Sequence, residues 1–129
     1  MQINTCVLGY GLSAQTFQIP FIVATEGLRL HSILQRPAAP GTTAGRASAA
    51  ADHPDVRIHP SIDAVCADRD VELAVISTAN ASHFALACAL LHAGKHVVVE
   101  KPFTVTSAEA DALVALAADK HRVLTVFHS

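Results

Sequence analysis

Residues 3–14 read Ile-Asn-Thr-Cys-Val-Leu-Gly-Tyr-Gly-Leu-Ser-Ala, and the interpretation of the whole chain begins with them. An apolar run ends at Gly9, a second glycine follows at Gly11, and Ala14 begins a segment with helical spacing. A strand that turns through glycines into a helix leaves backbone N–H groups without partners. Together with the helix dipole, these donors form a site for phosphate or pyrophosphate. Gly9 would permit the tight turn, Gly11 the close approach of a ligand, and Ala14 the packing of helix on strand.

This glycine motif is short, and it is informative only if the rest of the chain builds a parallel α/β sheet around it. Buried strands of such a sheet read as apolar runs separated by helical segments. Alternation of this kind predicts a doubly wound Rossmann sheet of six parallel strands in the order 3-2-1-4-5-6. The six runs cover residues 3–8, 28–34, 56–59, 71–77, 95–100 and 123–127.

The helix after the glycine turn is expected to begin with Ser13 as its cap, and Pro20 should kink it or split it into two. The residues predicted to face the sheet are Ala14, Phe17, Phe21 and Ala24. Further helices are expected over 46–52, 61–67, 82–93 and 106–120, the last opened by a capping box from Thr106 to Glu109. The buried face predicted for this last helix comprises Ala110, Leu113, Val114 and Ala117.

Composition limits the class of protein. The chain has 129 residues, of which 51% are hydrophobic and 16% charged, so we expect one globular domain over residues 1–129. A net charge of −2 argues against nucleic acid as a partner. No apolar run reaches the about 20 residues of a membrane span, and the N-terminus lacks a signal peptide, so a cytoplasmic protein is expected. The three cysteines are scattered and are expected to be small buried apolar residues.

In a doubly wound sheet, ligands bind beyond the carboxyl ends of the strands. Gln35 and Arg36 follow the second strand, where an NAD site carries an acid for the ribose 2′-hydroxyl. Residues 27–51 contain no carboxylate, and Arg36 could pair with a 2′-phosphate, so the sequence favours NADP over NAD. The alternative is that Arg36 is a solvated loop residue.

Thr78, Asn80 and His83 follow the fourth strand, beside the expected glycine turn. Thr78 and Asn80 are also ordinary capping residues, and His83 could face solvent. The other histidines are scattered without a ligand pattern, so no metal is expected.

Glu100-Lys101-Pro102 places two opposite charges at the end of a buried valine-rich strand. A lysine at the edge of a cleft can hold or protonate a substrate oxygen during hydride transfer, and desolvation would lower its pKa into a useful range. Lys101 is therefore the candidate catalytic residue. The alternative is a surface ion pair between Lys101 and Glu100.

Three stretches resemble the cofactor-binding domain of the Gfo/Idh/MocA oxidoreductases: residues 7–14, residues 75–80 with His83, and residues 93–103. The resemblance implies an NAD(P)-binding Rossmann fold with Lys101 near nicotinamide and substrate. It also implies that Glu100 and Asn80 contact the nicotinamide ribose and that the Lys101–Pro102 bond is cis. Ala79 stands where many members have proline. The cofactor-binding residues expected on all these grounds are Gly9, Tyr10, Gly11, Leu12, Ser13, Gln35, Arg36, Thr78, Asn80, His83 and Glu100.

The family continues into a second domain that completes the catalytic site and forms the usual dimer interface. The chain alone is therefore expected to bind cofactor as a monomer with little turnover of its small-molecule substrate, a sugar, polyol or similar hydroxyl or carbonyl compound. One alternative is a non-catalytic NAD(P)-sensing regulator, for which Lys101 would be superfluous. An S-adenosylmethionine methyltransferase shares the glycine turn, but the absence of an acid after the second strand and the presence of residues 100–102 argue against it.

Overall fold

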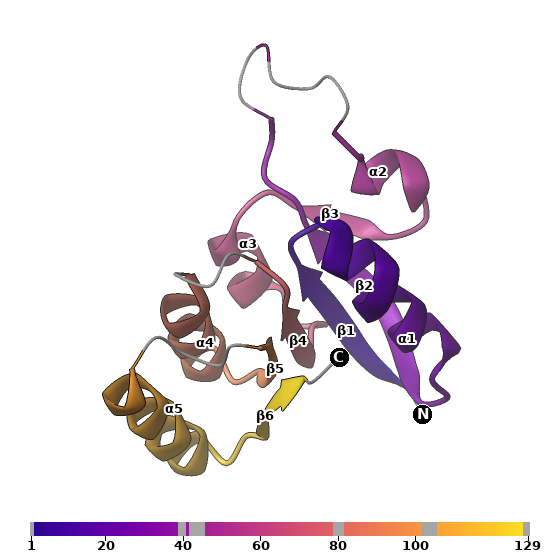
Figure 1. The fold of residues 1–129 in the computed structure, drawn as a ribbon. Coiled ribbons are helices and arrows are strands. Elements are labelled where there is room, and N and C mark those ends of the chain that lie inside the picture. Colours follow the sequence, from indigo (N-terminus) through magenta and orange to yellow (C-terminus); the bar gives the residue numbers. More distant parts are fainter. Residues whose placement is uncertain (1, 39–40, 42–45, 79–81, 102–105, 128–129) are drawn as a thin grey trace.

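The computed structural model describes residues 2–38, 41, 46–78, 82–101 and 106–127. Six strands form one parallel sheet in the order β3-β2-β1-β4-β5-β6 (Figure 1). Fold class and strand order are thus as predicted. The strands are β1 (Ile3–Leu8), β2 (Leu28–Leu34), β3 (Arg57–His59), β4 (Leu73–Ile76), β5 (His96–Glu100) and β6 (Leu124–Phe127).

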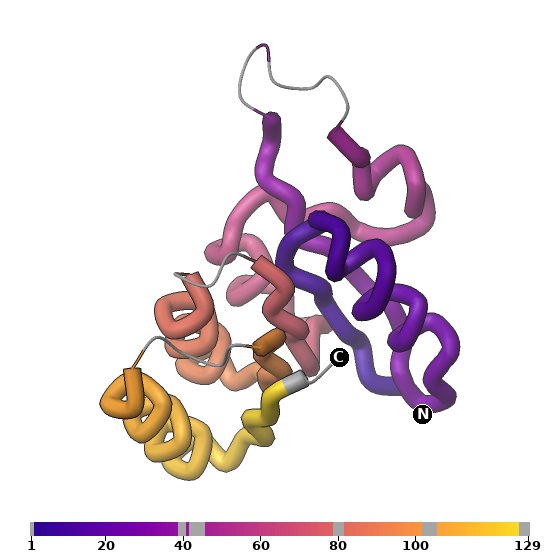
Figure 2. Tube along the Cα trace, in the orientation of Figure 1, coloured from indigo at the N-terminus to yellow at the C-terminus, as the bar shows by residue number. Residues whose placement is uncertain are grey.

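Helices cover both faces of the sheet, and each face has its own apolar core. One core joins the sheet to α3, α4 and α5, and the other joins it to η1, α1 and α2. Figure 2 shows that the first half of the trace builds the β1–β3 side and the second half the β4–β6 side, so the order reverses between β1 and β4. The helices are η1 (Ala14–Gln18), α1 (Ile19–Ala24), α2 (Ala49–Asp52), α3 (Ile62–Ala67), α4 (His83–His92) and α5 (Ser107–Lys120).

The segment after the glycine turn differs from the regular helix that its spacing predicts. It begins as the π-helical turn η1 and continues as α1, with Pro20 in the first turn of α1, so the expected split is confirmed. A π turn has a longer hydrogen-bonded repeat than an α turn, which changes the face that meets the sheet. Phe17 and Phe21 are therefore 48% and 54% exposed, Ala24 is exposed as well, and the predicted burial of all three was wrong. The buried positions are Ala14, Gln18, Ile19 and Ile22.

Two other helices depart from expectation. The predicted helix over 46–52 begins only at Ala49, because the Ser48 side chain accepts the Ala51 N–H and caps it there. In α5 the Thr106 side chain accepts the Glu109 N–H at 3.1 Å, as half of the predicted capping box. Val114 is 59% exposed, so its predicted burial was wrong, because α5 meets α4 and the sheet through Leu113 and Ala117.

The cysteines pack as apolar residues. Cys6 is fully buried, while Cys66 and Cys88 are half-buried against the α3–α5 core. Burial raises the pKa of the Cys6 thiol to about 12 and also raises those of Cys66 and Cys88, which argues against reactive thiolates. Within the described residues, none of the helices has the length and apolarity to cross a membrane.

Candidate functional site

The glycine turn lies where the carboxyl ends of β1, β2 and β4 meet. Gly9 donates its N–H to Leu34 O at 2.9 Å, and Ser77 donates its N–H to Leu8 O at 2.9 Å. Gly9 has φ +103°, and a Cβ at that position would lie 2.7 Å from Ser77 O. Only glycine fits there, because both the backbone conformation and the space forbid a side chain.

Gly11 is constrained differently from Gly9. A Cβ built at Gly11 would meet no protein atom within 4 Å, so its surroundings leave room for a ligand at the backbone. Ala14, about one helical turn further on, is fully buried in the core that joins the sheet to η1, α1 and α2. The placements of Gly9 and Ala14 match the roles that the motif assigns to them, and the ligand contact expected at Gly11 stays a prediction.

A cavity of about 520 Å³ opens at this turn. It lies between the glycine turn, the end of β2 and the segment that leads from β4 to α4. Its size is that of a small-molecule site. Its described lining residues include Gly9, Tyr10, Gly11, Gln35, Arg36, Arg46, Ser77, Thr78 and Ser82.

Gln35 holds one wall of this cavity in place. Its side-chain Nε2 donates to Ala47 O at 2.9 Å, and its Oε1 accepts the Ala49 N–H at 2.9 Å. The neighbouring Arg46 guanidinium donates to Arg36 O. The cavity is thus lined by two arginines, and none of its described lining residues carries a carboxylate. Arg46 was missed from the sequence, although it lies in the same acid-free stretch as Arg36.

Tyr10 and Leu12 flank Gly11. The Tyr10 hydroxyl donates to Asp52 Oδ2 at 2.7 Å, and its ring meets His53 edge-on at 6.0 Å between centroids. Burial and the hydrogen bond to Asp52 raise the pKa of Tyr10 to about 12. Tyr10 therefore attaches α2 to the glycine turn, while Leu12 is 80% exposed.

Glu100 links the site through its two carboxylate oxygens. Ser13 Oγ donates to Oε1 at 2.7 Å and Ser77 Oγ donates to Oε2 at 2.6 Å. The prediction that Ser13 caps the helix was wrong, because its hydroxyl is used by Glu100 and makes no cap hydrogen bond. The alternative of a surface ion pair between Lys101 and Glu100 is not seen among the described residues.

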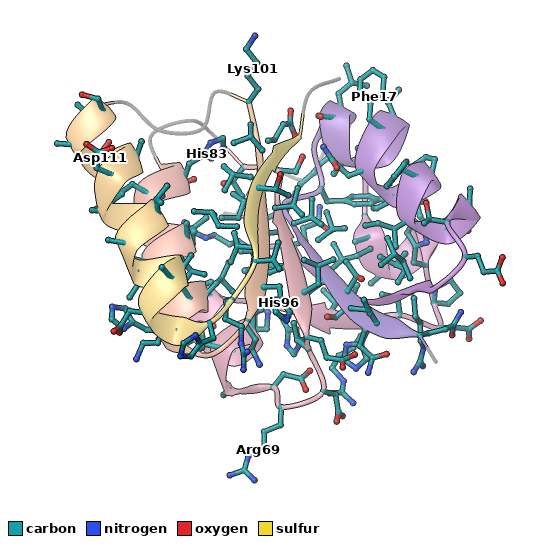
Figure 3. The ribbon with its side chains drawn as sticks, turned by 90° about the horizontal axis from the view of Figure 1, so that it is seen from below. Phe17, Arg69, His83, His96, Lys101 and Asp111 are labelled. Carbon is teal, nitrogen blue, oxygen red and sulfur yellow. The ribbon has the colours of Figure 1, made fainter. Side chains whose placement is uncertain are left out.

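Lys101 is exposed at the same edge of the sheet, at the end of β5. Figure 3 shows it extending from that edge, on the side where His83 lies. His83 is buried, and its Nε2 donates to Thr78 O at 3.0 Å, so the start of α4 is attached to the residue that follows Ser77. Thr78 Oγ1 is hydrogen-bonded to Ser82 Oγ at 2.6 Å. Asn80 and the Lys101–Pro102 bond lie outside the described residues.

One group of possible metal ligands occurs among the described residues, at the other end of the sheet. Ligand atoms of His31, Asp68 and Asp70 lie within 4.8 Å of one another. The Asp68 carboxylate is already engaged, since Arg57 donates to Oδ2 at 2.8 Å and His59 lies 3.0 Å from it. Of the three residues, Asp68 thus already has two side-chain partners.

A six-stranded parallel sheet with a glycine turn at its topological switch point defines a dinucleotide-binding Rossmann domain. Residues 3–128 match the family described as "Oxidoreductase family, NAD-binding Rossmann fold". The chain therefore belongs to the Gfo/Idh/MocA oxidoreductase family, and the domain is an NAD(P)-binding one.

Three individual relatives extend this result. The chain is 41% identical over 127 residues to the uncharacterized oxidoreductase YdgJ of Escherichia coli, covering 98% of this chain and 34% of YdgJ. It is 30% identical to the scyllo-inositol 2-dehydrogenase (NADP(+)) IolW of Bacillus subtilis, covering 98% of this chain and 33% of IolW. The crystal structure of Synechocystis biliverdin reductase with biliverdin and NADP+ superposes with a TM-score of 0.80 at 32% identity, covering 98% of this chain and 38% of that one. The chain thus spans about a third of the length of the relatives it matches.

Proposed function

We propose that this chain is the NADP-preferring cofactor domain of an oxidoreductase that moves hydride between nicotinamide and a sugar, polyol or similar hydroxyl or carbonyl compound. The observation that carries the cofactor preference is the cavity at the glycine turn. Arg36 and Arg46 line it without any carboxylate among its described lining residues. Guanidinium groups pair bidentately with phosphate, whereas a carboxylate at this place would select the 2′-hydroxyl of NAD.

The residues present fit the cofactor. The open space over Gly11 would admit a diphosphate to the backbone N–H groups of the turn, and Arg36 and Arg46 would supply the positive charge for a 2′-phosphate. The bound nicotinamide supplies hydride acceptance and donation. Lys101, at the open edge, would hold or protonate the substrate oxygen. The substrate class is supported by the dehydrogenase activity named for IolW.

The chain is proposed to act in the cytoplasm on a small-molecule substrate. Its three cysteines are free thiols, which is typical of a reducing compartment. Turnover is expected to require the further polypeptide that relatives possess, because Lys101 is exposed and an active site must exclude water.

Fluorescence titration of the 129-residue chain with NADPH and NADH tests the cofactor preference. NADPH should bind at least about tenfold more tightly, since hydrogen bonds between charged groups contribute about 1.5–3 kcal/mol. Arg36→Ala and Arg46→Ala should each reduce this ratio, whereas Arg29→Ala, at an exposed position of β2, should not. Equal affinities of the unmodified chain for the two cofactors would contradict the preference.

The choice between an enzyme and an NAD(P)-sensing regulator depends on Lys101. In a protein that includes the further polypeptide, Lys101→Ala should leave NADPH affinity nearly unchanged and abolish turnover. A variant that keeps its full biological activity would support the sensor instead.

A further inference from the structure

A second cavity, of about 710 Å³, lies at the edge of the sheet opposite to the cofactor site. It is formed where β1, β4 and β5 begin, with contributions from the end of α3 and the turn before β6. Figure 3 shows two of its lining residues, Arg69 and His96, toward the end of the sheet away from Lys101. The charged and titratable side chains of its lining are Cys66, Arg69, Glu72, Lys95, His96 and Arg122, and burial raises the pKa of the Cys66 thiol, which keeps it neutral.

Lys95 is the least expected of these residues. It is only 5% exposed, and its ammonium group donates to the backbone oxygen of Asp68 at 2.6 Å. No ion pair with Lys95 occurs among the residues that the structure describes, and the Asp68 carboxylate is engaged by Arg57 and His59. A buried charge is costly unless an opposite charge accompanies it. Lys95 thus lines the cavity with an ammonium group whose one hydrogen-bond partner among the described residues is a backbone oxygen.

Arg122 adds a second fixed cation. Its Nε donates to Gly94 O at 2.7 Å and one terminal nitrogen donates to His121 O at 3.0 Å. These two contacts hold the guanidinium at the cavity while leaving some of its five N–H donors available. Arg69, in the turn before β4, also lines the cavity and adds a third positive charge. It is exposed, and Figure 3 shows its side chain extending outward from this end of the sheet.

His96 contributes a hydrogen-bond donor rather than an acceptor. Its Nδ1 accepts the Val123 N–H at 2.9 Å, so in the neutral ring the hydrogen is on Nε2. Glu72 is the one carboxylate among the described lining residues, and its Oε2 accepts the Asn4 N–H at 2.7 Å. The cavity therefore carries three cations and a donor against one carboxylate that the backbone already holds.

We propose that this cavity binds a small anionic molecule through a phosphate or carboxylate group, at a site separate from the cofactor site. Its volume lies within the about 300–1,000 Å³ of small-molecule sites, and the exposed apolar lining residues Ile3 and Ala93 provide surface for the rest of the ligand. The anion supplies the counter-charge that Lys95 lacks. Because the lining residues begin the strands whose other ends form the cofactor site, the two ligands occupy opposite ends of one rigid sheet.

Inorganic phosphate is the probe for this site, followed by amide chemical shifts in the 129-residue chain. Phosphate should shift the amides of Lys95, His96 and Arg122 along one saturable curve. Arg122→Gln should raise the dissociation constant for phosphate about tenfold, equivalent to about 1.4 kcal/mol. Arg29→Gln, which removes an exposed arginine elsewhere, should leave it unchanged. Phosphate bound at the glycine turn would be recognised separately, by shifts at residues 9–13 that Arg36→Ala reduces.

Glu72→Gln distinguishes anion binding from a purely structural role of the cavity residues, because only anion binding depends on the charge of Glu72. Glutamine keeps an oxygen for the Asn4 N–H but removes the negative charge, so phosphate should bind more tightly to this variant. Lys95→Met should weaken binding further, and Arg69→Gln serves in its place if Lys95→Met does not fold. Shifts confined to residues 9–13, or shifts at 95, 96 and 122 that do not saturate, would overturn the proposal while leaving the cofactor site intact.

Discussion

Ser13 Oγ donates a hydrogen bond to Glu100 Oε1 at 2.7 Å, although the two residues are 87 positions apart in the chain. The second oxygen of the same carboxylate accepts Ser77 Oγ at 2.6 Å. One carboxylate thus joins the start of η1, the end of β4 and the end of β5, so β5 is attached to two of the segments beside the cofactor cavity. Lys101 is the next residue, so these two hydrogen bonds also help to fix the backbone position of the candidate catalytic residue.

Glu100→Ala should lower the free energy of unfolding by about 3 kcal/mol, because two hydrogen bonds to a charged group are lost and two hydroxyls are left unpaired. NADPH affinity should fall with it, since the glycine turn loses its attachment to β5. Urea denaturation and NADPH fluorescence measure the two effects. Glu26→Ala, at an exposed position, is the matched control and should change neither. Unchanged stability of Glu100→Ala would show that the linkage contributes little.

Gly9→Ala and Gly11→Ala form a matched pair of substitutions in the glycine turn. Gly9→Ala places a Cβ 2.7 Å from Ser77 O, at a backbone φ of +103° that a side chain disfavours. It should therefore lower the free energy of unfolding by about 3 kcal/mol or more. Gly11→Ala meets no protein atom within 4 Å, so it should leave the thermal midpoint nearly unchanged. It should nevertheless weaken NADPH binding, because its methyl group occupies space over the turn that the cofactor requires. A Gly11→Ala protein with unaltered NADPH affinity would place the diphosphate elsewhere.

The strands and their order could be predicted because each buried parallel strand is a local apolar run, and the glycine turn identifies the central one. The burial of the first helix could not be predicted in the same way. Its apolar spacing fits an α-helix, but the π turn at residues 14–18 makes Gln18 a buried residue, with a side-chain nitrogen that has no partner among the described atoms. Phe17 is left outside. Nothing in the local sequence indicates that π turn.

Site residues could be predicted only where their position follows from a single local segment of the sequence. Gly9, Gly11 and Arg36 could be identified from their position relative to a strand end. Ser13 was assigned as a cap because local patterns do not reveal that Glu100, a distant residue, competes for its hydroxyl. Arg46 was missed because only the Gln35 side chain, by bonding Ala47 and Ala49, brings that segment back to the cavity.

Tyr10 offers an optical test of the contact between the glycine turn and α2. It is the one tyrosine of a chain without tryptophan, so tyrosinate absorbance reports on it alone. Burial and the Asp52 hydrogen bond raise the pKa of Tyr10 to about 12, and Asp52→Asn should bring the midpoint down toward 10.0. Titration in concentrated urea should give about 10 for both proteins. If the folded protein titrates at its unfolded midpoint, the Tyr10–Asp52 hydrogen bond is absent in solution.

Asp68 should make stability depend on pH in a defined direction. Burial acts to raise the pKa of its carboxyl, but hydrogen bonds from the Asp70 N–H, Arg57 and His59 outweigh it and lower the pKa below 3.8. The unfolded chain therefore binds the proton more tightly than the folded one, and this contribution to stability is present above the unfolded value. It is lost as the pH falls through the folded pKa.

Asp68→Asn should accordingly reduce the free energy of unfolding at pH 7 by about 1.5–3 kcal/mol, the range for hydrogen bonds to a charged group. The difference between the two proteins should shrink below about pH 4, where the carboxyl of the unmodified protein begins to bind its proton. Urea denaturation over a pH series measures this difference, with Asp55→Asn, at an exposed position, as the control. A difference that stays constant down to the acid limit of folding would mean that Asp68 acts through packing and not through its charge.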